Sequence, residues 1–307
     1  MRIWTHPACL RHDPGHGHPE SPQRLAAVID ALRRSDLRLD WHEAPAVTRE
    51  QLRRVHTREL IAAVLDEPVA GHRRLDPDTV MSADSAEAAQ RAAGAVCAAV
   101  DAVLADPHEL GFCAVRPPGH HATTGEAMGF CLFNSVAVGA AHALAGHGLA
   151  RVAVLDFDVH HGNGTQEIFW DDPRVLYLSS HQAPLYPGTG HAHEHGAGNV
   201  LNAPLPPGSG REVFQAAWRE RLLPELDRYA PQLILVSAGF DGHRLDPLAG
   251  LNLEAADYAW LSGQIVTVAQ SHARGRIVSA LEGGYSLTAL RECSLAHVTA
   301  LTGHAGA

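Results

Sequence analysis

The sequence predicts a single-domain α/β protein in which helices cover both faces of a mainly parallel sheet, giving three layers (αβα). Two features of the 307-residue chain lead to this fold class. Short apolar segments alternate with amphipathic or alanine-rich windows along the whole length, as in chains that build a parallel sheet. The apolar segments rarely alternate with polar residues, which is typical of strands buried on both faces. No repeat, low-complexity tract or linker interrupts this pattern, so we expect one domain over residues 1–307.

The expected strands are the short apolar segments themselves. Several of them run directly into stretches rich in glycine and proline. Ligands bind outside the carboxyl ends of the strands in sheets of this kind, so we expect the functional site at those stretches. The predicted strands are Arg2–Thr5, Gly111–Val115, Arg151–Asp156, Val175–Leu178, Leu233–Ser237 and Ile277–Leu281.

Helix signals occur between the predicted strands. Ser21 and Pro22 begin one helix, with serine as the N-cap and proline at the first helical position. Asp84 and Glu87 resemble a capping box that opens an alanine-rich helix ending at Ala105. Pro224 is expected to kink or split the helix in which it lies. The other predicted helices are Ser135–Ala145, Arg211–Tyr229, Glu254–Ala273 and Leu287–Leu301.

Composition excludes several classes of protein. A hydrophobic content of 46% with 19% charged residues is globular and excludes a disordered or coiled-coil chain. The formal net charge of −10 argues against a nucleic-acid partner bound through charge. No apolar run suggests a membrane span and the first residues lack a signal peptide, so we expect a cytoplasmic protein without a membrane partner. The five cysteines form no C-x-x-C pair, which fits reduced thiols.

The segment richest in chemical groups follows the predicted strand that ends at Asp156. It reads V-L-D-F-D-V-H-H-G-N-G, and it places Asp156, Asp158 and His160 on one side of an extended chain. Two acids at the end of a buried strand are costly unless they are paired or bind a cation. Aspartate with histidine suits Zn²⁺ or Fe²⁺. The alternative interpretation is a solvated turn with a helix N-cap.

Three further polar segments follow predicted strands. R-P-P-G-H-H ends in His120 and His121, which taken alone could equally be surface histidines. S-A-G-F-D-G-H-R-L-D-P-L contains two aspartates. E-G-G-Y-S contains Gly283 and Gly284, which would let the backbone approach a ligand closely, although the motif alone could be a plain turn. Four such segments at one edge of one sheet favour a common site.

Together these motifs, with G-F-C-L-F-N, resemble the zinc-dependent histone deacetylase family. This family includes bacterial amidohydrolases and has the arginase–deacetylase fold. The resemblance covers residues from about 12 to 290 in the family's order, which makes it specific. H-H-G-N-G-T-Q and D-P-L are more similar to the class II branch than to class I.

The resemblance implies a role for each matching residue. Zinc would be held by Asp158, His160 and Asp246, three ligands that leave a position open for water and substrate. The implied reaction is hydrolysis of a zinc-polarised amide by a water that a histidine deprotonates. Asn163 stands where class I members carry a carboxylate, which should leave its histidine partner readier to act as a base. The implied catalytic residues are His120, His121, Asp156 (orienting His120), Asn163 (opposite His121) and Tyr285 (the oxyanion donor).

The resemblance also implies an acyl-lysine tunnel and a second cation. The tunnel would have Phe130 and Tyr186 as walls and Gly129 as floor, with Gly283 and Gly284 beside it. Cys131 should lie near the tunnel and is interpreted as an inert buried thiol. A structural K⁺ would use the Asp156 side chain, the backbone carbonyls of Asp158 and His160, and Ser179.

The substrate class is less clear than the reaction. One interpretation is removal of acetyl or other acyl groups from lysine in proteins or peptides, and another is hydrolysis of acetylpolyamines. Polyamine specialists carry an acid directly after D-P, where this chain has Leu248, and the rim segment from about Val69 to Ser85 is short. Both points favour acyl-lysine and a rim without a carboxylate. An inactive binding module and a manganese arginase are the remaining alternatives, and a homo-oligomer stays open.

The other histidine-rich segments are not needed for this chemistry. The H-A-H-E-H segment could hold a metal, but an exposed loop is the favoured interpretation of His191, His193 and His195. His12, His16 and His18 fall where the family has a rim loop.

Overall fold

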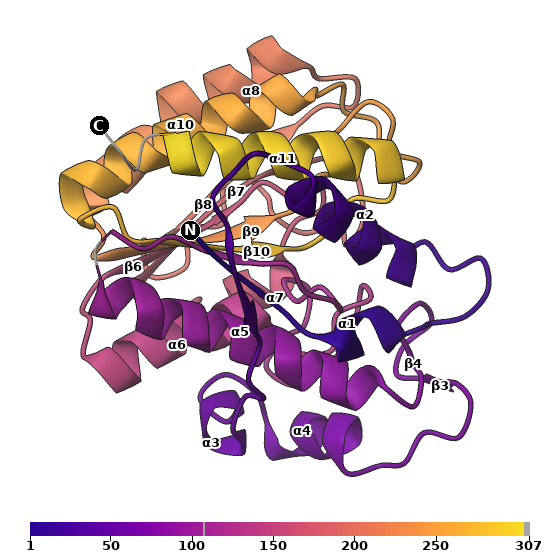
Figure 1. Ribbon diagram of the computed structural model, residues 1–307. Helices are drawn as coiled ribbons and strands as arrows, with labels where there is room; N and C mark the ends of the chain where they lie inside the picture. The colour runs from indigo at the N-terminus through magenta and orange to yellow at the C-terminus, as the bar shows by residue number, and fades with distance from the viewer. Residues whose placement is uncertain (107, 304–307) are drawn as a thin grey trace.

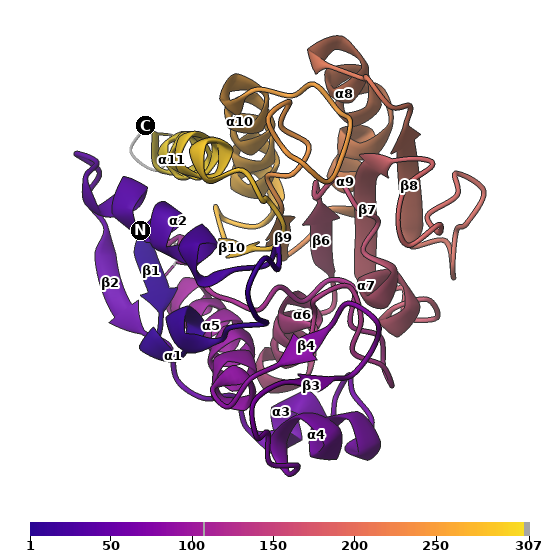
Figure 2. The same cartoon turned by 90° about the vertical axis from the view of Figure 1, so that its right-hand side faces the viewer.

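One sheet of eight parallel strands lies at the centre of the computed structural model, which describes residues 1–106 and 108–303. The strand order is β2-β1-β5-β10-β9-β6-β7-β8, and every neighbouring pair is parallel. Figure 2 shows the strands from β2 at one edge to β8 at the other. The strands are β1 (Arg2–Thr5), β2 (Asp40–Glu43), β5 (Gly111–Cys113), β6 (Val152–Asp156), β7 (Val175–Gln182), β8 (Val200–Leu205), β9 (Leu233–Ala238) and β10 (Ile277–Leu281).

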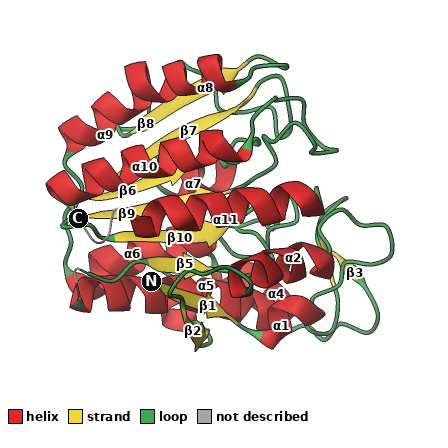
Figure 3. Ribbon diagram, turned by 45° about the horizontal axis from the view of Figure 1, so that its top comes forward, coloured by secondary structure: helices red, strands yellow, loops and turns green. Residues whose placement is uncertain are grey.

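Helices cover both faces of this sheet, which confirms the predicted three-layer fold. Figure 1 shows α8, α10 and α11 with α2 above the sheet, and α5 and α6 below it. Figure 3 shows α10 and α11 side by side over the strands. The helices are α1 (Pro7–Arg11), α2 (Pro22–Arg33), α3 (Arg49–Leu52), α4 (Arg58–Leu65), α5 (Ser85–Ala105), α6 (Ser135–His147), α7 (Asn163–Ile168), α8 (Arg211–Ala217), α9 (Leu223–Tyr229), α10 (Ala255–His272) and α11 (Leu287–Gly303).

All of the predicted strands are present, with small changes at their ends. The sequence prediction missed the two edge strands β2 and β8, whose residues include polar groups and, in β8, a proline. It also ended β7 too early, because this strand continues through buried polar residues that form hydrogen bonds inside the protein. A separate antiparallel pair, β3 (Arg73–Arg74) and β4 (Val80–Met81), lies outside the main sheet.

One helix prediction needs correction, and another is confirmed with an added detail. The capping box at Asp84 is wrong, because the Asp84 side chain caps no backbone N–H and instead pairs with Arg11 at 2.8 Å. The long helix Arg211–Tyr229 contains a π-helical turn, η1 (Trp218–Leu222), between α8 and α9. Pro224 occupies the first turn of α9, directly after the π-helical turn, so the predicted disruption occurs there.

Helix α5 differs from the expectation that no segment reaches membrane-spanning length. By length and composition alone it could cross a membrane. However, 67% of its most apolar window is buried, where the helix packs against α6, β1, β5 and β10. We therefore interpret α5 as a core helix that supports the sheet.

Candidate functional site

Four polar segments meet at one edge of the sheet because they follow four adjacent strands. The strands β5, β10, β9 and β6 are neighbours in that order, and all run in the same direction. Their carboxyl ends therefore lie together, as the sequence predicts. The segments that follow them contain the tandem histidines, the Gly-Gly-Tyr motif, the aspartates of the D-P-L segment and the D-F-D-V-H segment.

A buried group of metal-ligand type lies at this edge. His160 Nδ1 is 3.1 Å from Asp158 Oδ1 and 3.2 Å from Asp241 Oδ2. All three side chains are buried, and their ligand atoms lie within 4.8 Å of one another. Asp241 was not assigned a role from the sequence. Asp246 lies beside this group, where its carboxylate accepts hydrogen bonds from the backbone N–H groups of Leu248 and Tyr285.

The charges in this group fit a bound cation. Burial, together with the charge of Asp158, raises the pKa of Asp241 to about 7. Burial opposes a charged His160, but its hydrogen bonds to Asp158 and Asp241 raise the pKa of this histidine to about 10. Buried carboxylates destabilise a protein strongly unless a cation compensates their charge. Carboxylate and imidazole are the donors that Zn²⁺ accepts, so the residues present fit this metal.

The tandem histidines have different partners. His120 Nδ1 lies 3.0 Å from Asp156 Oδ2, and His121 Nδ1 lies 2.8 Å from Asn163 Oδ1. Burial disfavours the His120 cation, yet the charges of Asp158 and Asp156 outweigh it and raise the pKa of His120 well above its usual value. Burial and the neighbouring cationic histidines lower the pKa of His121 well below its usual value. The two rings, 4.1 Å apart, therefore favour opposite protonation states.

A buried glutamate holds the histidine loop in place. Glu282, the first residue after β10, accepts hydrogen bonds from the backbone N–H groups of Gly119 and His120 at 2.6 and 3.2 Å. Burial raises the pKa of Glu282 to about 7. The signal that identified Asp156, an acid at the end of a buried strand, could also have identified Glu282.

A second buried network connects the N-terminal segment to the site. The Glu20 carboxylate forms two hydrogen bonds with Arg116, at 2.5 and 2.6 Å, and one with Arg24. Arg24 donates to the carbonyl oxygens of Glu282 and Gly284, and its guanidinium lies 4.7 Å from the centre of the Tyr285 ring. The tyrosine loop and the histidine loop are thus tied to one ion-pair network that sequence motifs did not reveal.

A pocket lined by several of these residues lies at this edge of the sheet. It has a volume of about 230 Å³. A Cβ atom at Gly129 would lie 2.4 Å from the His121 ring, so only glycine allows the pocket floor to approach the histidine. Phe130 adopts a left-handed backbone conformation (φ 67°), an uncommon one that sets the position of its ring in the wall. The lining residues are Asp78, His121, Gly129, Phe130, His160, Leu185, Tyr186, Leu248 and Tyr285.

Comparison with known proteins identifies the family. A model of the histone deacetylase domain matches residues 18–301. The chain belongs to the histone deacetylase family.

Relatives of this family match the chain over nearly its whole length. A histone deacetylase-like amidohydrolase of Pseudomonas aeruginosa is 40% identical over 94% of the chain and 77% of the relative. A probable deacetylase of Archaeoglobus fulgidus is 39% identical over 98% of the chain and 86% of the relative. The crystal structure of the HDA15 HD domain superposes with a TM-score of 0.93 at 34% identity, covering 98% of the chain and 88% of that structure. These findings confirm the predicted fold and place the protein among deacetylase-type hydrolases.

The pocket mouth corrects one expectation about the rim. Leu248 lines the pocket as predicted, but so does the carboxylate-bearing residue Asp78, from the turn between β3 and β4. Partial burial and a hydrogen bond with Asp76 raise the pKa of Asp78. The pocket of this histone deacetylase-family protein is therefore lined by an acidic residue as well as by Leu248, which the expectation of a rim without a carboxylate did not include. The D-P-D-T turn carries no local signal that it folds over the pocket.

The other predicted site residues lie as follows. Ser179 faces Asp156 in the β6–β7 register, and its hydroxyl lies 2.9 Å from His181 Nδ1; a K⁺ site there stays a prediction. Gly283 does approach the site closely, since its backbone N–H donates to Asp158 Oδ2 at 2.8 Å. Cys131 is fully buried, and burial raises the pKa of its thiol well above the usual value, which fits an inert thiol.

Proposed function

We propose that the protein is a zinc-dependent deacylase that hydrolyses the amide of acetylated lysine in proteins or peptides. The observation that carries this proposal is the position of His121 and His160 in the wall of one pocket that Tyr285 also lines. A pocket of about 230 Å³ has room for an extended alkyl chain with an acetyl group.

His121 is the proposed general base. Asn163 Oδ1 accepts a hydrogen bond from His121 Nδ1, which leaves Nε2 without a proton. The lowered pKa keeps this imidazole neutral near pH 7. His120, paired with Asp156, carries the proton and is the proposed source of the proton that the departing amine receives.

The proposed zinc ligands are Asp158, His160 and Asp246, with Asp241 as a further carboxylate next to His160. When bound, zinc would supply a Lewis acid that polarises the amide carbonyl. Tyr285 lines the same pocket, and burial raises the pKa of its phenol well above the usual value. It therefore stays protonated and can donate a hydrogen bond to the developing oxyanion.

A second candidate function is hydrolysis of acetylpolyamines. The observation that favours it is Asp78, whose carboxylate at the pocket mouth could pair with an ammonium group of the substrate. A lysine side chain buried in the same pocket leaves an uncharged peptide backbone at the mouth, and Asp78 could equally accept hydrogen bonds from its N–H groups. The two candidates therefore differ in what Asp78 recognises, a charge or a backbone.

The deciding experiment compares kcat/KM for an Nε-acetyl-lysine peptide and for N-acetylputrescine at low and high salt. We expect the peptide to be the better substrate at both salt concentrations. Preference for N-acetylputrescine at high salt would overturn the acyl-lysine assignment, because a contact pair is screened less than long-range attraction. Hydrolysis of neither compound would overturn the deacylase proposal.

Two variants refine this comparison. Asp78→Asn removes the charge at the mouth, and Glu59→Gln is its matched control because Glu59 lines a separate cavity next to the pocket. Under the acyl-lysine proposal Asp78→Asn changes peptide hydrolysis mainly through KM, and Glu59→Gln leaves it unchanged.

A separate variant tests the proposed zinc ligands. Asp246→Ala should lower both the zinc content and the activity, whereas full zinc occupancy in this variant would remove Asp246 from the ligand set.

A further inference from the structure

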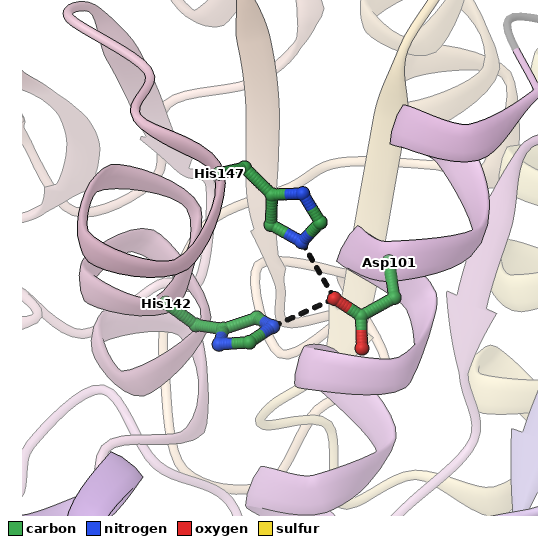
Figure 4. Close-up of side chains that lie close together, drawn as sticks. All are labelled: Asp101, His142 and His147. Atoms are coloured by element: carbon green, nitrogen blue, oxygen red, sulfur yellow. Dashed lines mark hydrogen bonds and ion pairs between the residues drawn. The ribbon is translucent and has the colours of Figure 1, made fainter.

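A second group of metal-ligand side chains lies on the outer face of the helix pair α5–α6. His142 Nε2 and His147 Nε2 each lie 2.7 Å from the same atom, Asp101 Oδ1 (Figure 4). Asp101 belongs to α5 and both histidines belong to α6, so the contact connects the two helices. The two imidazole rings are perpendicular, with 5.3 Å between their centres.

The local backbone explains why the histidines converge. His147 is the last residue of α6, and Gly148 ends the helix in a left-handed conformation. Gly146 has no side chain, and a Cβ there would lie only 3.2 Å from the His142 ring. The last turn of α6 thus presents both imidazoles to α5 without a side chain between them.

The donor atoms suit a divalent cation of the zinc class. Two imidazole nitrogens and one carboxylate oxygen are common zinc ligands. Around tetrahedral zinc such atoms are about 3.3 Å apart. The present 2.7 Å contacts therefore need to open by roughly 0.6 Å when a cation replaces the two shared protons, which side-chain rotation can supply. Side-chain exposures of 55% for Asp101 and 32% for His147 leave room for water as the remaining ligands.

Two neighbours oppose metal binding. Arg54 Nη1 donates to His142 Nδ1 at 3.1 Å, and Gln51 Nε2 lies 3.5 Å from the same atom. These donors fix the proton of the ring on Nε2, the atom that would have to bind the metal. A metal at Nε2 requires Nδ1 to carry the proton, so Arg54 and the weaker donor Gln51 must move away from Nδ1. Arg54 also pairs with the exposed Glu50 on the surface, and this alternative partner makes the movement feasible. Arg54 therefore lowers the affinity of the Asp101–His142–His147 group for a metal ion.

We propose that Asp101, His142 and His147 form a second, surface zinc-class site that links α5 to α6. Within the part of the chain that the structure describes, only this group and the buried Asp158–His160–Asp241 group bring three such ligand atoms within 4.8 Å. The new site lies outside the pocket, because none of its three residues is among those that line it. It requires no role in the deacylase reaction.

The test measures bound zinc per chain after equilibrium dialysis against buffered free Zn²⁺, together with the melting temperature. We expect two zinc ions per chain in the wild-type protein and one in His147→Ala and in Asp101→Asn, whose affinity for the second ion should fall by more than about 100-fold. The second ion should raise the melting temperature of the wild-type protein only, because it binds the folded state. Deacetylase activity is expected to stay unchanged in both variants.

Two matched variants separate this site from nonspecific binding to histidine. His191 and His193 stack with 5.4 Å between their ring centres on an exposed loop but belong to no three-ligand group among the described residues. His193→Ala should therefore keep both zinc ions. Arg54→Gln should tighten the second site by about 2- to 10-fold, the value of one competing hydrogen bond. One zinc ion in the wild-type protein, or two in both His147→Ala and Asp101→Asn, would overturn the proposal.

Discussion

Substitution of Gly239 by alanine should disable the site through one misplaced carboxylate. Gly239 follows β9, and a Cβ atom there would lie 1.9 Å from Asp158 Oδ2 and 2.4 Å from its Cγ. Ordinary contact begins at 3.4 Å, so the Asp158 carboxylate must move by about 1.5 Å. A displacement of about 1 Å in a reacting group costs roughly 100-fold in rate, and we therefore expect kcat/KM to fall by about 100-fold or more.

The assay measures acetate release from an Nε-acetyl-lysine peptide and the zinc content of the same preparation. Gly210→Ala is the control, because a Cβ there meets its nearest neighbour, the Asn252 carbonyl oxygen, at 3.4 Å. We expect the control to keep full activity and zinc, and Gly239→Ala to lose both while remaining folded. Wild-type kcat/KM in a folded Gly239→Ala protein would refute the role of Asp158 and the close packing on which it depends.

Three further predictions concern the tyrosine, the buried ion pair and a buried histidine. Tyr285→Phe should lower kcat by about 10²–10³ with little change in KM, and a change confined to KM would make this hydroxyl a binding group only. Glu20→Gln should lower the free energy of unfolding by about 3–5 kcal/mol in urea titrations, since it leaves Arg116 buried without its counter-charge; a loss below 1 kcal/mol would contradict this. Burial lowers the pKa of His297 to about 3, whereas the same group in the unfolded chain has a pKa of about 6.5. Below pH 6.5 the unfolded chain therefore binds a proton that the folded protein does not. This linkage lowers the free energy of unfolding by about 2 kcal/mol at pH 5 relative to pH values above 6.5. His297→Gln should reduce the loss of stability between pH 7 and pH 5 by this amount, and an unchanged loss would show that another group titrates.

The central strands could be predicted because both of their faces are buried. β6, β9 and β10 consist wholly of buried residues, so an apolar run in the sequence is enough to locate them. The edge strand β2 reads D-W-H-E and is only partly buried, and β8 contains Asn202 and Pro204. Their strand conformation depends on pairing with one neighbour, which a single sequence does not encode locally.

The residues of the candidate site also fall into those that the sequence locates and those that it does not. Asp156, Asp158 and His160 were found because acids at the end of a buried strand need compensation. Asp78 could not be found in this way, because its place at the pocket mouth depends on the path of the turn between β3 and β4. The position of Asp241 beside His160 likewise depends on how the loop after β9 packs against β6.

Restoration of activity by zinc tests the central claim most directly. The measurement uses chelator-treated His147→Ala protein, in which the surface site is removed, and follows acetate release from an Nε-acetyl-lysine peptide as Zn²⁺ is added back. We predict no release by the metal-free protein and full activity after one equivalent of zinc, because the proposed reaction depends on a cation held by the buried residues Asp158 and His160. Undiminished release by the metal-free protein, or no recovery in a folded protein that has taken up zinc, would contradict the account.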